Sequence, residues 1–324
     1  MVMEARVGSK EVLKKLYEGV SSVLESAGFK HEVINFPVKY RERSIDIVAS
    51  SGEHEALIIR IKDLMHVNKN EAQDLVKSSL ALDAIPFVVS EAPEIYENVV
   101  VEKEGVYLIS LKTFQNMYLG RDELIALYKK GELFIKVDSE VFSKKRTELR
   151  HTLTSLSSLL NISRKTLETY EKRGGNITIE TAEKLASVLG DDVVKPISAK
   201  DLREEFVSRS SREQQGLTSS DTILIKTNLK KLLDMNLDES KIFKIRRSAP
   251  DYIIKDKETF ITVDVTRSRG YSMREALIKT SECLKFSKVT EAGVGVLTDD
   301  AEKARVIKDI LSVTGKKNLE VIKV

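Results

Sequence analysis

The chain has 324 residues, of which 41% are hydrophobic and 32% charged, with 53 Lys and Arg against 50 Asp and Glu. This composition is typical of a globular protein and excludes a disordered or uniformly basic one. No apolar run reaches the ~20 residues that a membrane-spanning helix needs. No signal-peptide pattern opens the chain and its single cysteine, Cys283, excludes an intramolecular disulfide, so we expect a cytoplasmic protein of two or three domains.

Residues 1–130 predict an N-terminal α/β domain. Apolar side chains recur every three or four residues over Lys10–Ala27 and Asn68–Leu82, which favours two helices. Strand-like runs cover His31–Phe36, Ser44–Ala49, Glu55–Lys62, Ile85–Ser90, Asn98–Val101 and Val106–Ser110. The predicted order therefore begins α-β-β-β-α-β, with a mixed sheet. A last helical run, Asp122–Lys130, ends the domain.

Residues 131–195 predict a central all-α domain, whose helices follow a short strand-like piece at Glu132–Lys136. Ser139 is expected to cap its first helix, and Thr152 to cap the next one. The apolar side of that next helix is expected to hold Leu153, Leu156, Leu159 and Leu160. Asn161 then stands at a turn, where it tolerates a left-handed backbone better than most residues.

The segment Leu153–Lys172 resembles the helix-turn-helix of the Cro/phage-repressor (Xre-like) class. The match lies at one small residue and at apolar positions, namely Ser157, Leu156, Leu160, Ile162, Leu167 and Tyr170. The next helix also matches, with Thr178 as its cap and apolar positions at Ile179, Ala182, Leu185, Ala186 and Leu189. Asn161, where Gly is usual, and Leu153, where a polar residue is usual, depart from the class. An ordinary helical hairpin in a core is the alternative interpretation.

The resemblance implies that residues 163–172 form a recognition helix in the major groove of double-stranded DNA. Eight Lys or Arg and three Asp or Glu lie between Lys144 and Arg173, which places positive charge where phosphates would lie. The expected DNA-binding residues are Thr154, Ser163, Arg164, Lys165, Thr166, Thr169, Lys172 and Arg173. Base edges are expected to meet Arg164, Lys165 and Thr169, and phosphates to meet Thr154, Lys172 and Arg173. The two acidic residues of this helix, Glu168 and Glu171, are expected to make helix-internal or interdomain pairs rather than to accept from cytosine.

Residues 196–220 predict a linker around one short helix at Ala199–Val207. Residues 221–324 repeat the first pattern and predict a second α/β domain. Helical runs cover Thr222–Met235, Ser272–Phe286 and Ala301–Thr314, and strand-like runs cover Lys241–Arg247, Asp251–Lys255, Thr259–Thr266, Gly293–Thr298 and Leu319–Val324. The order again begins α-β-β-β-α-β, which indicates a divergent duplication.

Both α/β domains resemble the PD-(D/E)xK nuclease core, a restriction-endonuclease-like fold. Its chemistry requires two carboxylates that hold Mg²⁺ and a lysine near the attacking water. In the first copy, Asp46 matches the first acid and Lys62 matches the lysine. The second acid falls on Arg60, a cation that would repel the metal ion. We therefore expect the first copy to be inactive.

In the second copy, Asp251 and Asp264 match both acids, but Thr266 stands at the lysine position. Each copy thus lacks one element of the motif. We expect no catalytic residue, no cofactor and no dedicated metal site, with Asp251 and Asp264 as candidates for weak metal binding. A purely structural role for Asp46 and Asp251, as turn caps or partners of neighbouring Arg residues, is the simpler interpretation.

These features predict a sequence-specific, DNA-binding transcriptional regulator. The overall layout resembles an archaeal family of Cro-type helix-turn-helix regulators with large flanking domains. One such helix reads too few base pairs for a unique site, so we expect a homodimer on half-sites about 34 Å apart, paired through the α/β domains. The alternatives are a metal-dependent nuclease or junction-processing enzyme, and a protein-interaction module. The sequence gives no argument for or against an effector.

Overall fold

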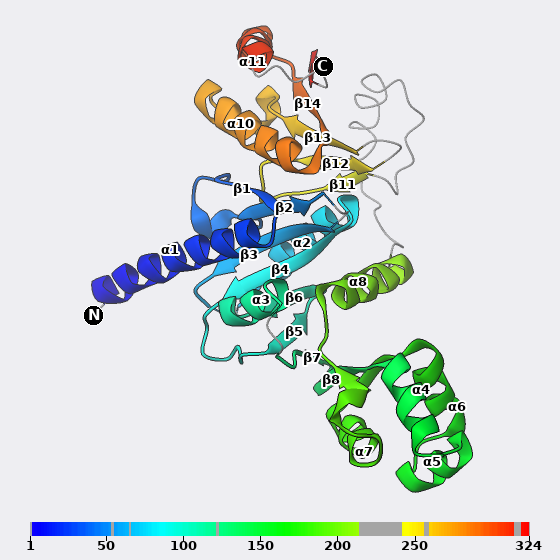
Figure 1. The fold of residues 1–324 in the computed structure, drawn as a ribbon. Helices are drawn as coiled ribbons and strands as arrows, with labels where there is room; N and C mark the ends of the chain where they lie inside the picture. Colours follow the sequence, from blue (N-terminus) through cyan, green and yellow to red (C-terminus); the bar gives the residue numbers. More distant parts are fainter. Residues whose placement is uncertain are drawn as a thin grey trace.

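The computed structural model of the chain describes residues 2–52, 55–64, 66–120, 123–213, 242–255, 259–313 and 319–323 (Figure 1). Its helices are α1 (Val2–Ser26), α2 (Lys69–Ala81), α3 (Leu111–Tyr118), α4 (Ser139–Glu148), α5 (Leu153–Leu160), α6 (Arg164–Arg173), α7 (Ile179–Leu189), α8 (Ala199–Glu213), α10 (Met273–Thr290) and α11 (Ala301–Val313). Its strands are β1 (Lys30–Val33), β2 (Ile47–Ser51), β3 (Glu55–Lys62), β4 (Ala84–Ser90), β5 (Val99–Lys103), β6 (Val106–Ile109), β7 (Ala126–Lys129), β8 (Glu132–Val137), β9 (Gly175–Thr178), β10 (Val194–Lys195), β11 (Ile242–Lys244), β12 (Tyr252–Lys255), β13 (Thr259–Asp264), β14 (Gly293–Thr298) and β15 (Leu319–Lys323). Across these ranges, no helix combines the length and the apolar character that crossing a membrane requires.

The first of two sheets holds ten strands and begins with the predicted mixed arrangement. The strands β1, β2 and β3 pair antiparallel, whereas β3, β4 and β6 pair parallel. Buried apolar side chains run along β3 and β4, because helices cover both faces of the sheet there. One face packs against α1, α3 and α8 through Leu16, Phe114 and Phe206, and the other packs against α2 through Leu75 (Figure 1).

The second sheet repeats the strand pairing of the first, as the predicted duplication requires. The strands β11, β12 and β13 pair antiparallel, and β13, β14 and β15 pair parallel. The same backbone hydrogen bond occurs in both sheets and marks equivalent positions. The N–H of Ile34 donates to Asp46 O, and the N–H of Ile245 donates to Asp251 O, both at 2.8 Å. The predicted helix Thr222–Met235 lies outside the described residues.

The prediction that the central domain is all-α was wrong. The predicted helix Asp122–Lys130 is replaced by the strand β7, which pairs parallel with β5 and antiparallel with β8. Lys130 and Gly131, with φ angles of 52° and 88°, form the two-residue turn of this hairpin. The strands β9 and β10 also pair with β8. The first sheet therefore continues past residue 130, because strand partners from both sides satisfy the backbone of β7 and β8.

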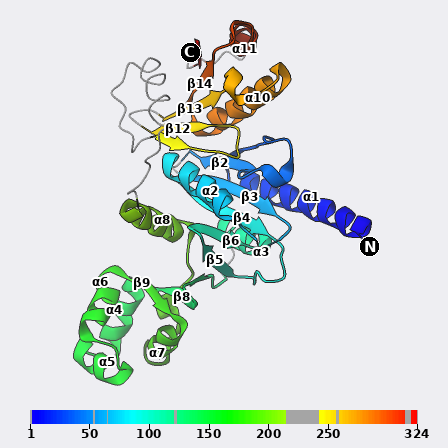
Figure 2. The same cartoon turned by 180° about the vertical axis from the view of Figure 1, so that it is seen from behind.

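The helix α8 lies within the predicted linker and is longer than the predicted helix Ala199–Val207. Its side chains bind three strands of the first sheet, β7, β8 and β9. Lys129 Nζ of β7 lies 2.5 Å from Glu205 Oε1, and Lys136 of β8 pairs with Asp201. Asn176 Nδ2 of β9 donates to Glu205 Oε2 at 3.2 Å. The central helices lie at one end of the molecule, and the second sheet lies at the other end (Figure 2).

Candidate nucleic-acid interface

The helices α5 and α6 form the predicted pair around a tight turn. Thr152 caps α5, its hydroxyl accepting the N–H of Ser155 at 3.0 Å, and Ser163 caps α6. Asn161 takes the left-handed conformation that we predicted, with φ 55° and ψ 41°. Leu156 and Leu167 are fully buried between the helices. Apolar contacts and caps together fix the angle at which α6 leaves the turn.

The outer surface of α6 carries most of the predicted DNA-binding residues. Exposed side chains on α6 and at the ends of both helices are Thr154, Ser163, Arg164, Lys165, Thr169, Lys172 and Arg173. Thr166 is partly buried, and its hydroxyl lies 2.7 Å from that of Ser163. Lys172 Nζ lies 2.6 Å from Glu168 Oε1, which is the helix-internal pair that we predicted. The surface therefore has the predicted cations, one of them paired.

An ion pair between Arg146 and Glu171 fixes α6 against α4. Arg146 Nε and Nη2 donate to Glu171 Oε1 at 2.9 and 2.6 Å, and Ser143 Oγ donates to the same oxygen at 3.0 Å. Arg146 Nη1 also donates to His151 O at 2.9 Å, just before the cap of α5. One guanidinium thus joins α4 and α6 to the residue before the cap of α5, and Glu171 pairs with another helix of the central domain rather than within its own helix or across domains, as was predicted.

Two details of the central helices differ from the predictions. Leu159 is 59% exposed, because Leu156 and Leu160 already face the core and a neighbouring helical position turns away by about 100°. The cap of α4 is Asp138 rather than Ser139. Asp138 Oδ1 accepts the N–H groups of Glu140 and Val141, the second and third residues of α4, both at 3.1 Å. A carboxylate at this position also interacts favourably with the helix dipole.

In the first copy, the nuclease-like positions form a closed cluster of charges. Arg60 Nη1 lies 2.5 Å from Asp46 Oδ2, and Arg60 Nε lies 2.7 Å from Glu71 Oε1. Lys62 Nζ lies 2.8 Å from Glu71 Oε2, and the Tyr40 ring lies 4.3 Å from the guanidinium carbon. Asp46 is 0% exposed, and both Arg60 and Glu71 are 2% exposed. The guanidinium therefore fills the space between two buried carboxylates, where a metal ion would need oxygen ligands.

A tyrosine from α1 completes this cluster. The Tyr17 hydroxyl donates to Asp46 Oδ1. Burial, and then the charge of Asp46, raises the pKa of Tyr17 far above its ordinary value. Burial also raises the pKa of Tyr40, although the charge of Arg60 opposes this shift. Both phenols stay protonated at neutral pH, so each can donate a hydrogen bond that stabilises the cluster.

The second copy aligns with the first differently from the prediction. Asp46 Oδ2 accepts the N–H of Ile61 at 2.8 Å, and Asp251 Oδ2 accepts the N–H of Asp264 at 2.7 Å. Asp264 is therefore equivalent to Ile61, and a buried valine is equivalent to Arg60. Neighbouring residues of a strand face opposite sides of the sheet. The assignment of Asp264 to the second acid of the motif was thus wrong by one residue.

Each acid of the second copy has its own cation. Lys279 Nζ of α10 lies 2.7 Å from Asp251 Oδ1, and Arg269 Nε donates to Asp264 Oδ2 at 2.8 Å. Burial raises the pKa of Asp251, although Lys279 opposes the shift. Burial alone would also raise the pKa of Asp264, but hydrogen bonds from Thr266 and Arg269 lower it below its ordinary value. The sequence did not identify Lys279 or Arg269 as partners.

No group of three or more His, Cys, Asp or Glu side chains that could hold a metal ion occurs in the part of the chain that the structure describes. The sequence also did not single out Glu71, although a signal was present. Asn68 and Glu71 form a capping box at the start of α2, and Ser272 and Glu275 form another at the start of α10. This spacing marks equivalent helix starts in the two copies.

Residues 13–123 match the family model of a PD-(D/E)XK superfamily domain. The match spans the first copy, including Asp46, Arg60 and Glu71. Together with the mixed sheets, it shows that this part of the chain has a restriction-endonuclease-like fold. No solved structure matches the chain.

Two relatives match the chain over nearly its whole length. A protein from Saccharolobus solfataricus is 26% identical over 307 residues, which cover 92% of this chain and 91% of the relative. A protein from Pyrococcus horikoshii is 28% identical over 322 residues, which cover 95% and 94%. Both are provisionally named HTH-type transcriptional regulatory proteins.

Proposed function

We propose that this protein is a sequence-specific transcriptional regulator of the Cro/phage-repressor type, which places α6 in the major groove of double-stranded DNA. The observation that carries the proposal is the exposed surface of α6, which presents Arg164, Lys165 and Thr169 beside a capped turn. A short capped helix that projects two cations is suited to the groove, which admits one α-helix. The names of the two relatives agree with this function.

In this proposal, Arg164, Lys165 and Thr169 contact base edges. The side chains of Arg164 and Lys165 are exposed, so both are available to guanine O6 and N7. The Thr169 hydroxyl donates to Lys165 O at 2.9 Å, which leaves its oxygen free to accept a hydrogen bond from a base. These three residues therefore set the sequence preference.

Phosphates bind the residues at the ends of the two helices. Thr154 lies in the first turn of α5, where backbone N–H groups and the helix dipole favour an anion. Lys172 and Arg173 lie in the last turn of α6, and Lys172 exchanges its partner Glu168 for a phosphate. Ser163 and Thr166 contribute by fixing the start of α6, since the Ser163 hydroxyl accepts the N–H of Thr166 at 3.1 Å.

We also propose a division of labour along the chain. Residues 131–195 read DNA, residues 1–130 and 221–324 form the frame that carries them, and residues 196–220 connect the frame. Two chains bind as a homodimer to half-sites about 34 Å apart, or a multiple of that spacing. Genome-wide capture of bound DNA tests this function, and a shared palindrome is the expected result. The absence of any enriched sequence would contradict it, and negligible DNA affinity at low salt would favour a protein-interaction module instead.

A metal-dependent nuclease is the second candidate, because the superfamily model covers residues 13–123. The charges around the motif positions argue against it. Arg60 lies between the two carboxylates of the first copy, and Lys279 and Arg269 hold those of the second. Purified protein with Mg²⁺ or Mn²⁺ is expected to leave duplex and branched DNA intact. Cleavage that Asp264→Ala abolishes would establish the nuclease.

A further inference from the structure

The two α/β copies pack against each other through the same elements. We call β1–β4 with α2 the N-terminal unit, and β11–β14 with α10 the C-terminal unit. The helix α2 contacts β11 and β12, and the equivalent helix α10 contacts β1 and β2. Each unit therefore uses one helix and its two first strands, which we call the paired face (Figure 1). This reciprocal use of one surface is the geometry of a two-fold interface.

Hydrogen bonds across the paired face start from equivalent backbone donors, although their acceptors, Asp74 and Glu282, lie at different distances from the caps of α2 and α10. Asn35 and Arg246 are equivalent, because each follows the isoleucine that pairs with Asp46 or Asp251. The N–H of Asn35 donates to Glu282 Oε2 of α10 at 2.7 Å. The N–H of Arg246 donates to Asp74 Oδ1 of α2 at 3.2 Å. Each unit thus uses a carboxylate on its helix to accept the backbone of the other unit.

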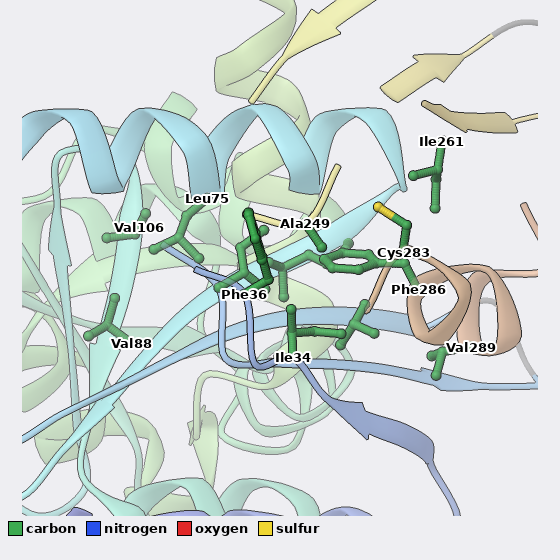
Figure 3. Packing of buried hydrophobic residues seen from close by; sticks show 14 of the residues in the cluster. Ile34, Phe36, Leu75, Val88, Val106, Ala249, Ile261, Cys283, Phe286 and Val289 are labelled. Carbon is green, nitrogen blue, oxygen red and sulfur yellow. The ribbon is translucent and has the colours of Figure 1, made fainter. Parts of the chain in front are cut away.

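Apolar side chains from both units form one continuous core (Figure 3). Members from the N-terminal unit include Ile34, Phe36 and Leu75, and members from the C-terminal unit include Cys283 and Phe286. Each of these side chains is at most 8% exposed. A core of this kind is typical of a permanent interface rather than a transient one.

Ion pairs close the rim on both sides of the paired face. Lys255 Nζ lies 2.6 Å from Asp83 Oδ1, and Lys288 pairs with Glu32. Each pair again joins a lysine of the C-terminal unit to an acid of the N-terminal unit. The surface that two copies of the chain would need for pairing through these units is therefore fully covered within one chain.

We propose that the C-terminal unit acts as an internal partner, which occupies the self-association face of the N-terminal unit and leaves the free chain a monomer. Each chain then has two α/β units but only one α6. The pseudo-two-fold axis that relates the two units therefore does not relate two DNA-reading helices. Two chains meet only when each binds a half-site, through surfaces other than the paired face. The last statement rests on the proposed function, whereas the monomer and the internal pairing do not.

A crosslinking experiment on the full chain without DNA tests the internal pairing. In the double variant Glu32→Cys/Lys288→Cys, two thiols replace an ion pair at the rim of the face. The native Cys283 is buried, so it does not compete for a maleimide. A short bis-maleimide is expected to link the two thiols within one chain, which peptide mapping detects. A covalent dimer, or the absence of any crosslink, would overturn the proposal.

The mass in solution is the second measurement. Light scattering on the wild-type chain at micromolar concentration is expected to give 36.5 kDa. The single variant Lys288→Cys is the control, and it is expected to keep this mass after treatment with the crosslinker. A wild-type mass of twice this value without DNA would overturn the proposal. Failure of the wild-type chain to bind DNA would instead contradict the proposed function, so the two failures are distinguishable.

Discussion

The substitution Arg146→Met removes the guanidinium that joins α4, α5 and α6 and keeps a side chain of similar length. It deletes two hydrogen bonds to Glu171, at 2.9 and 2.6 Å, and one to His151 O at 2.9 Å. The Arg146 and Glu171 side chains are 22% and 15% exposed. The substitution therefore leaves a largely buried carboxylate without its counter-charge.

The expected loss of stability lies between two limits. Breaking a fully buried ion pair costs ~3–5 kcal/mol, and an exposed pair contributes ~0–1 kcal/mol. Glu171 keeps one hydrogen bond from Ser143 Oγ at 3.0 Å, which reduces the penalty. We therefore expect a loss of about 2–3 kcal/mol, which corresponds to a roughly 30- to 150-fold change in the local opening equilibrium.

Hydrogen exchange measured by mass spectrometry reports this loss where it occurs. Peptides from α4 and α6 of Arg146→Met are expected to lose protection by that factor, because local opening governs amide exchange. Peptides from β3 and β4 are expected to stay unchanged. Lys144→Met on the same helix is the matched control, since its ion pair with Glu148 joins side chains that are 72% and 54% exposed.

The same variant tests the link between the ion pair and DNA reading. If Arg146 positions α6, then Arg146→Met lowers the ratio of specific to non-specific affinity, while Lys144→Met changes mainly the salt dependence. Glu171→Gln keeps an acceptor for Ser143 and Arg146 and is expected to show a smaller loss. Equal exchange in Arg146→Met and Lys144→Met would refute the argument, because the buried pair would then contribute no more than an exposed one.

Four further predictions concern the other charged residues. Arg164→Ala is expected to weaken specific DNA binding by ~1–3 kcal/mol and to relax one base preference. Lys172→Ala is expected to lower the slope of log affinity against log salt by about 1. Fluorescence anisotropy measures both effects, and an unchanged footprint removes Arg164 from the contact set. Arg60→Met is expected to destabilise the chain by ~3–5 kcal/mol in urea unfolding, because the buried Asp46 loses its close cation and the buried Glu71 keeps only Lys62. A loss under ~1 kcal/mol contradicts this account. Asp264 has a folded pKa below its ordinary value of 3.8, so its ionised form stabilises the fold above that pH and the effect disappears as pH falls through the lower folded pKa. The Tm difference between wild type and Asp264→Asn is expected to shrink between pH 6 and pH 3, and a constant difference speaks against it.

Local signals in the sequence predicted the central helix pair in detail. The caps Thr152 and Ser163 act within three residues of their own position, and Asn161 takes its left-handed conformation because of its own side chain. The repeated order of helices and strands was also predictable, since hydrophobic periodicity reports the face that each element buries. These features depend on neighbours along the chain, so the sequence contains them directly.

The strand β7 shows where local signals fail. Its four residues, Ala126–Lys129, have no strand periodicity that a short window can separate from a helix, and the choice was made by β5 and β8 on either side. A strand needs partners for its backbone groups, and those partners lie elsewhere in the chain. The prediction of an all-α domain failed for this reason.

The candidate sites divide in the same way. The sequence by itself determined that a capped helix with Arg164 and Lys165 follows a tight turn, because caps and turn chemistry are local. Only the tertiary structure decided that Arg60 lies between two carboxylates, that Lys279 reaches Asp251, and that the two units cover each other's paired face. These contacts join residues distant in sequence, and a charge acquires its partner only when folding brings both to the same place.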